Sequence, residues 1–144
     1  MMPTQVLVAS ASAYRRWWYV EQLRLYGMKA ATAVDGLDCI EQMRTSRPDV
    51  VLLEPSLLWG GSDGVLAVRS EDTSLQNIPV VLVAFDGVSV AWYQLAQYSL
   101  QGLLLRLPSG QELAATLLLV SQEVCGASPI PRDPSWQHRK TLSS

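Results

Sequence analysis

The sequence has few of the residues on which metal centres, disulfide frameworks and acid–base catalysis depend. Its two cysteines, Cys39 and Cys125, fit neither a metal-ligand spacing nor a disulfide framework. Its one histidine, His138, lies near the end of the chain, and no nucleophile–base pair is evident. We therefore expect no enzymatic activity, no metal and no cofactor.

Clusters of basic residues and long apolar runs are also scarce. The net charge is -2, and the basic residues are scattered except for Arg15-Arg16 and Arg139-Lys140, so nucleic acid is not an expected partner. No segment reaches the roughly 18 apolar residues of a membrane span, and the N-terminus lacks a charged region followed by a long apolar stretch. These features predict a cytoplasmic protein with no membrane partner.

What the chain does contain is the composition of a globular domain. Of its 144 residues, 49% are hydrophobic and 17% are charged. We expect one domain over residues 1–125. From Gly126 onward, prolines and polar residues without apolar periodicity predict a tail, 126–144, that is disordered or ordered only by a partner.

Short apolar runs alternate with helical patterns, which predicts a parallel sheet with helices on both faces. The expected strands are 5–9, 29–33, 50–53, 79–84 and 103–105. A first helix runs to Tyr26, a second lies between Gly36 and Arg47, a third passes through Val65, Leu66 and Val68, a fourth spans about 90–98, and a fifth spans 111–124.

Five landmarks follow one another at compatible spacing. They are Gly27 after the first helix, Asp35-Gly36 before the second, the segment 47–53 leading to an acidic residue, Asp63-Gly64 before the third helix, and the segment 78–81 at the fourth strand. With these landmarks, residues 5–124 resemble the receiver domain of bacterial two-component response regulators. The resemblance implies an α/β, flavodoxin-like (CheY-like) three-layer sandwich with five helices and a five-stranded parallel sheet in the order 2-1-3-4-5.

The resemblance also implies a degenerate phosphorylation pocket. Phosphorylated receivers use an aspartate after strand three, two acidic residues after strand one, a hydroxyl at strand four, a lysine after strand five, and often an aromatic on strand five. The corresponding residues here are Glu54 at the phospho-acceptor position, then Ser10 and Ala11, Ala84, Arg106 and Leu103.

These substitutions are unfavourable for phosphoryl transfer. Magnesium usually needs at least one or two carboxylates, and Ser10 and Ala11 supply none. Glutamate also moves the carboxylate outward by one methylene, and a misplacement on the order of 1 Å can cost about a hundredfold in rate. We consider an ion pair between Glu54 and Arg106 that holds one conformation, or alternatively two side chains that both point into water.

Beside this edge lies a glycine-rich loop containing Trp59, Gly60 and Gly61. Open α/β sheets bind ligands in this region when they bind any. The glycines could cradle a phosphate-containing ligand, although a tight turn is the simpler interpretation.

The first and fourth helices carry more aromatic residues than one sheet contact can bury. Tryptophan and tyrosine are favoured as interface anchors, so these residues could form a partner surface or extra core. The candidate interface residues are Trp17, Trp18, Trp92, Tyr93, Tyr98 and Leu117.

Three functions remain open at this point. The first is a phosphorylation-independent receiver-like module that acts through a protein partner or a homodimer. The second is a response regulator that still operates in a phosphorelay with Glu54 at the acceptor position, with a histidine kinase as partner. The third is a small-molecule sensor at the edge formed by Ser10, Glu54, Trp59, Ala84 and Arg106.

Overall fold

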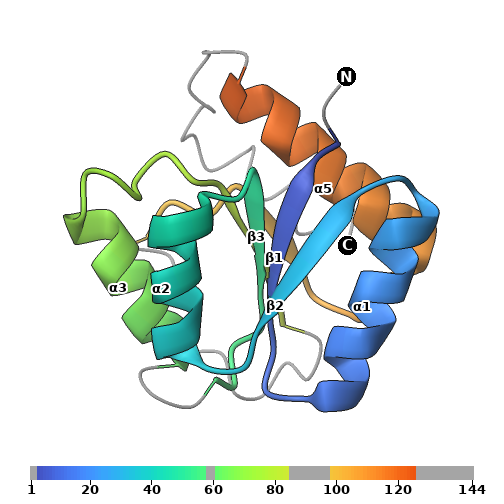
Figure 1. Cartoon of the computed structure of the whole chain (residues 1–144), viewed down its shortest axis with the longest axis horizontal. Helices are drawn as coiled ribbons and strands as arrows, with labels where there is room; N and C mark the ends of the chain where they lie inside the picture. The colour runs from blue at the N-terminus through green and yellow to red at the C-terminus, as the bar shows by residue number, and fades with distance from the viewer. Residues whose placement is uncertain (1–2, 58–60, 85–97, 126–144) are drawn as a thin grey trace.

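A computed structural model describes residues 3–57, 61–84 and 98–125 of the chain (Figure 1). The strands are β1 (Gln5–Ala9), β2 (Lys29–Ala33), β3 (Val50–Leu53), β4 (Val80–Val83) and β5 (Gly102–Leu104), and the helices are α1 (Ala13–Leu25), α2 (Gly36–Ser46), α3 (Gly61–Glu71) and α5 (Gly110–Cys125). Several predictions fall outside these ranges: almost all of the fourth helix at 90–98, the residues Trp59, Gly60, Trp92 and Tyr93, and the tail at 126–144.

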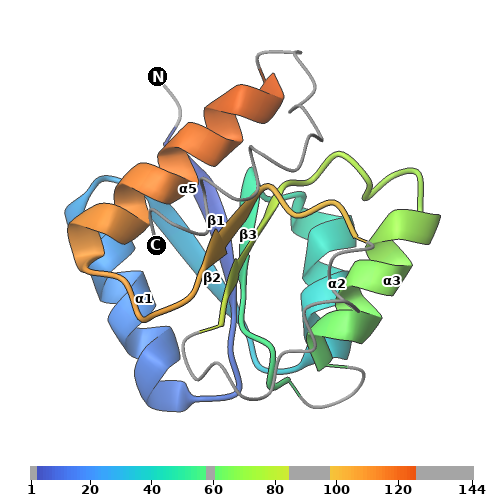
Figure 2. The ribbon, with the colours of Figure 1, turned by 180° about the vertical axis from the view of Figure 1, so that it is seen from behind.

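The five strands form one parallel sheet in the order β2-β1-β3-β4-β5, which confirms the predicted topology. Helices α1 and α5 cover one face of the sheet, and α2 and α3 cover the other (Figures 1 and 2). The described residues therefore contain four of the five expected helices. No helix in these ranges is long and apolar enough to span a membrane.

The core consists of two layers, one on each face of the sheet. Every residue of β3 and β4 is buried, as expected for central strands that are covered on both faces. The predicted second helix turns Cys39 and Met43 toward the sheet, and burial raises the pKa of the Cys39 thiol to about 12. On the opposite face, Leu117 of α5 is fully buried, so its assignment to a partner surface was wrong.

The helix ends follow local sequence signals. Ser12 and Asp35 are the N-caps of α1 and α2, and each side chain accepts a hydrogen bond from a backbone N–H three residues later. Gly27, predicted to stop the first helix, has φ +80°, a conformation that glycine adopts without steric cost. Gly61 begins α3 and so belongs to a helix rather than to the predicted loop.

A buried arginine joins α3 to the starts of β4 and β5. Arg69 is only 3% exposed. Its guanidinium donates to the carbonyl oxygens of Ile78 at 2.7 Å and Ser99 at 2.9 Å, and to the side-chain oxygen of Gln101 at 2.9 Å. Ser99 and Gln101 lie where the chain enters β5, so this one side chain fixes how the last strand joins the sheet.

We predict that Arg69→Lys lowers the free energy of unfolding by about 2–3 kcal/mol, because the lysine ammonium lacks the planar fork and leaves buried oxygens without a donor. Chemical denaturation measures this effect. The matched control is Arg44→Lys, at an exposed pair with Asp72, where a change within about 0.5 kcal/mol is expected. Equal effects of the two substitutions would contradict the role of Arg69.

Candidate functional site

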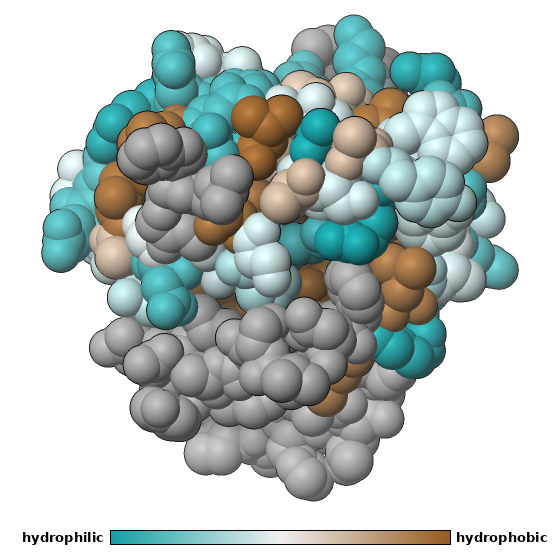
Figure 3. Space-filling view, turned by 90° about the horizontal axis from the view of Figure 1, so that it is seen from below, coloured by the Kyte–Doolittle hydropathy of each residue, from teal (hydrophilic) through white to brown (hydrophobic). Residues whose placement is uncertain are grey.

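The predicted site residues at the ends of β1, β3 and β4 lie along one edge of the sheet. The backbone N–H of Glu54 donates to Ala9, that of Ser10 donates to Ala33, and that of Ala84 donates to Leu104. These bonds continue the strand ladders by one residue. They therefore place Ser10, Glu54 and Ala84 together at the carboxyl edge, as the sequence predicted. Figure 3 looks onto this edge from below and shows hydrophilic and hydrophobic atoms interspersed over its described part.

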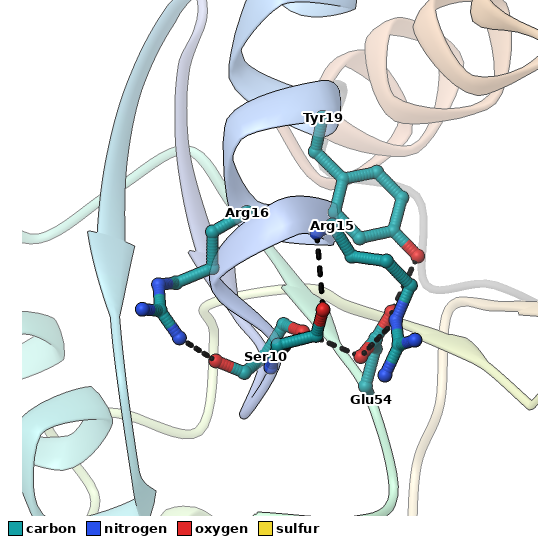
Figure 4. Close-up of polar contacts among 6 residues, drawn as sticks. Ser10, Arg15, Arg16, Tyr19 and Glu54 are labelled. Carbon is teal, nitrogen blue, oxygen red and sulfur yellow. Dashed lines mark hydrogen bonds and ion pairs between the residues drawn. The ribbon is translucent and has the colours of Figure 1, made fainter.

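Glu54 is the centre of a buried polar cluster that consists of Ser10, Arg15, Tyr19 and Glu54 (Figure 4). The glutamate is 3% exposed. Oε1 accepts from Ser10 Oγ at 2.6 Å, Oε2 accepts from the Tyr19 hydroxyl at 2.6 Å, and Arg15 Nε lies 3.1 Å and 3.0 Å from the two oxygens. Both carboxylate oxygens are thus engaged by side-chain donors.

Ser10 connects this cluster to the start of α1. Its hydroxyl donates to Glu54 and accepts from the backbone N–H of Ser12 at 3.1 Å. Ser12 in turn caps the helix by accepting from the N–H of Arg15. The carbonyl of Ser10 accepts from Arg16 Nη1 at 2.7 Å, so both arginines of the first helical turn are held near the strand end (Figure 4).

The electrostatics of the cluster keep Tyr19 as a donor. Burial raises the pKa of the Tyr19 hydroxyl far above its usual value, and the neighbouring Glu54 carboxylate raises it further, whereas Arg15 lowers it. The phenol therefore stays protonated and donates to the carboxylate. Short O–H···O contacts of this kind are typical of charge-assisted hydrogen bonds.

The structure contradicts the predicted Glu54–Arg106 ion pair. Arg106 instead forms a two-pronged contact with Glu112, at 2.9 Å and 3.0 Å. Glu112 lies in the first turn of α5, where the helix dipole favours an acidic side chain. Glu54 takes its cation from α1 instead, and its side chain is only 4% exposed, so it does not point into water. Arg106 is 56% exposed in its pair with Glu112.

Comparison by sequence finds one curated relative and no family model that matches. Protein Rrf1 of Nitratidesulfovibrio vulgaris is 33% identical over 90 residues, which are 62% of this chain. The match spans 65% of the length of that relative, slightly less than two thirds.

Comparison by structure finds receiver domains at low sequence identity. The signal receiver domain of a Luxo repressor protein from Vibrio parahaemolyticus aligns with a TM-score of 0.76 at 16% identity, over 86% of this chain and 94% of that one. The chemotaxis protein CheY4 of Vibrio cholerae gives 0.73 at 19% identity, over 83% and 99%. The receiver domain of a Pseudomonas aeruginosa sensor histidine kinase, which holds a magnesium ion in its active-site cleft, gives 0.76 at 13% identity, over 84% and 99%.

The chain has the receiver fold. The remaining predicted pocket positions differ in exposure. Ala11 is exposed, Ala84 is fully buried, and Leu103 is partly buried against the core on the α2 face.

The candidate interface residues that the structure describes differ in exposure. Trp17 is 58% exposed, and its ring centroid lies 6.0 Å from that of Tyr14, which is also exposed. Trp18 is partly buried against the core between α1 and the sheet, and Tyr98 is partly buried against the core of the opposite face. Among the described candidates, only Trp17 is therefore a well-exposed side chain.

Sequence reasoning missed Arg15 and Tyr19 as members of the site. Two signals point to them. With Ser12 as N-cap, Arg15 lies in the first helical turn, where a positive charge opposes the helix dipole and calls for a carboxylate partner. Tyr19 lies four residues later on the same helix face, and a buried tyrosine hydroxyl usually has a hydrogen-bond partner.

We predict that Tyr19→Phe lowers the free energy of unfolding by about 1.5–3 kcal/mol, because the carboxylate loses a buried donor. Urea denaturation measures the change. Tyr14→Phe, at a residue that is 71% exposed, is the matched control and should change stability by less than about 0.5 kcal/mol. A Tyr19→Phe variant as stable as the wild type would show that the hydrogen bond contributes little.

Proposed function

We propose that this chain is a receiver-like signalling module that acts through protein contacts and does not accept a phosphoryl group. The observation that carries the proposal is that both oxygens of the buried Glu54 carboxylate are already bound by Ser10, Tyr19 and Arg15. The bound carboxylate takes the place that an acceptor carboxylate would have.

A nucleophilic carboxylate needs one oxygen free to approach phosphorus in line. In the observed arrangement, an approaching phosphoryl group would have to displace Ser10 or Tyr19 from an oxygen that is only slightly exposed. Displacement would leave a buried charge with fewer donors, which costs about 1–3 kcal/mol for each lost hydrogen bond. The cluster therefore disfavours the first step of the reaction.

The residues at this edge also do not fit a magnesium ion. Magnesium prefers octahedral oxygen ligation with one or two carboxylates. Here Glu54 is paired with the Arg15 guanidinium at 3.0 Å, and the neighbouring strand end supplies a serine and an alanine. Within the described residues, no group of three or more histidine, cysteine or acidic side chains could hold a metal.

The same cluster provides a rigid connection that a signalling module without chemistry could use. Arg15 and Tyr19 belong to α1, whereas Glu54 ends β3. The first two turns of α1 are therefore held against the sheet by two side-chain donors, Arg15 and Tyr19, to one carboxylate. The presented surfaces stay constant, and binding partners rather than phosphorylation would then set the signalling state.

The experiment is intact-mass analysis after incubation with acetyl phosphate and magnesium. We expect no phosphoryl adduct on the wild type and none on Glu54→Asp, because the magnesium-binding carboxylates are missing in both. The triple variant Ser10→Asp, Ala11→Asp, Glu54→Asp should gain an adduct, because it supplies the acidic pair and the shorter acceptor.

Comparing the three proteins shows whether the missing acidic pair or the longer acceptor side chain prevents phosphorylation. An adduct on wild-type Glu54 would overturn the proposal and support the alternative, a response regulator in a phosphorelay. Thermal unfolding of each variant checks that it is folded, and a histidine kinase with phosphorylated histidine serves as a second donor. Adduct formation from that donor on the wild type would count against the proposal equally.

A further inference from the structure

The outer edge of β2 has no strand beside it among the described residues. β2 pairs only with β1, and four of its five residues are exposed or partly exposed. In Figure 1, β2 lies nearest the viewer, between α2 and α1, with no described element in front of it. Its sequence is Lys-Ala-Ala-Thr-Ala, so a lysine stands at one end, and the middle carries no charge or proline that would discourage strand pairing.

The backbone of β2 offers hydrogen-bonding groups to a further strand. Lys29 N–H bonds to Thr4 and the carbonyl of Ala33 bonds to Ser10, so residues 29, 31 and 33 face β1. Successive residues of a strand point in opposite directions, and Ala30 and Thr32 therefore direct their N–H and C=O groups away from the sheet. The carbonyl of Thr32 accepts from Gln42 Nε2 at 2.7 Å and retains a second lone pair.

Exposed apolar side chains flank β2 at both ends. Leu25 is 76% exposed and Tyr26 is 49% exposed just before the strand, and Val34 is 48% exposed and Leu37 is 63% exposed just after it. Beside the first half of β2, a hollow of about 300 Å³ is lined by Lys29, Ala30, Ala31, Gln42, Ser46 and Pro48, together with residues 5–7 of β1. The surroundings of β2 thus include outward-facing backbone groups, exposed apolar side chains and a hollow.

We infer that this edge binds β2 of a second copy of the chain, antiparallel and centred on Ala31. Ala30 then lies opposite Thr32 of the partner and exchanges both backbone hydrogen bonds with it, and the symmetry repeats the exchange. Lys29 lies opposite Ala33, which keeps the two lysines a strand length apart. The small side chains of Ala30, Ala31 and Thr32 allow the two strands to approach.

The two-fold symmetry of this pairing also matches the apolar residues. An antiparallel arrangement brings the start of one β2 against the end of the other, so Tyr26 and Leu25 of each copy meet Val34 of its partner. The axis is perpendicular to the sheet and keeps both α2 helices on the same face. Leu37, in the first turn of one α2, then approaches the hollow beside Ser46 at the end of the other.

The first test is sedimentation velocity of the full chain without any phosphate donor. Small interfaces of about 600 Å² per copy form transient complexes, so the average mass should rise toward a dimer over roughly 10–1,000 µM. Leu37→Glu should weaken association at least about tenfold by placing a charge against the hollow. The matched control, Leu119→Glu on α5, alters a similarly exposed leucine and should leave association unchanged.

Ala30→Pro tests the backbone bonds directly. Its N–H points away from β1, so proline removes an outward donor while the existing ladder stays intact. We expect the same loss of association as for Leu37→Glu. A wild type that stays monomeric over the whole range, or a dimer that only Leu119→Glu disrupts, overturns the inference, and the edge would then be open to a strand of another protein.

A cross-link tests the register. In an antiparallel pair, residues opposite each other in a non-hydrogen-bonded position have Cα atoms about 4.5 Å apart, within disulfide range. Oxidation of Ala31→Cys should therefore link Cys residues at position 31 of two copies, as identified by peptide mapping. The exposed Ala115→Cys on α5 is the control, and linkage at 115 as efficient as at 31 would overturn the register.

The proposed β2 dimer gives the proposed interaction module a surface, and its formation does not depend on Glu54. A phosphoryl adduct on Glu54 would overturn the proposed function and leave the dimer unaffected. A monomeric chain would overturn the dimer and leave the Glu54 cluster as described.

Discussion

The burial of one carboxylate at the end of β3 is the constraint that organises the carboxyl edge of this protein. Removing a carboxylate from water costs several kcal/mol even after relaxation, and this cost is offset only when charge and hydrogen bonds are supplied together. Arg15 supplies the charge, and Ser10 and Tyr19 supply the two short hydrogen bonds. All three donors come from the end of β1 or from the first two turns of α1, so satisfying Glu54 also fixes where this helix begins and how it lies on the sheet.

The polar cluster and the apolar core belong to one packing arrangement. The ring of Tyr19 is fully buried in the core between the sheet, α1 and α5, while its hydroxyl reaches the carboxylate. A change at Glu54 would therefore be felt through Tyr19 by the residues of α5 that pack on the same face, Leu113 and Leu117 among them. In the opposite direction, the position of α5 is held at its start by Ser109, which caps the helix, and by the pair of Arg106 with Glu112. The Glu54 cluster is thus connected to α5 by direct packing, through the buried ring of Tyr19.

The sequence predicted the fold well, because the strands and their landmarks are local signals. Continuous apolar runs identified β3 and β4, and Gly27 and Asp35 identified the ends of α1 and α2. The same reasoning placed Glu54 at the correct edge but assigned it the wrong cation, because Arg106 was chosen by its position in the fold whereas the real partner depends on which side chain reaches a buried carboxylate. The three successive leucines of α5 show a related limit. A helix turns by 100° per residue, so only Leu117 faces the core while Leu118 and Leu119 remain exposed, and the pattern alone did not reveal which one was buried.

The two ends of β2 are the part of the molecule on which the proposed association depends. Under the proposed function the charge at the end of β3 does not change and the domain presents the same surfaces at all times, so specificity would come from surfaces that are complementary in the resting state. β2 meets this condition because its small central residues leave the backbone accessible and its exposed apolar residues lie before and after the strand, where an antiparallel copy would bring them together. An isolated exposed leucine needs no explanation, but here four large apolar side chains are exposed just before and just after one edge strand. Gln42 donates to the outward carbonyl of Thr32 at that edge, so in the proposed pairing this carbonyl accepts from both Gln42 and the backbone N–H of the second copy, using its two lone pairs.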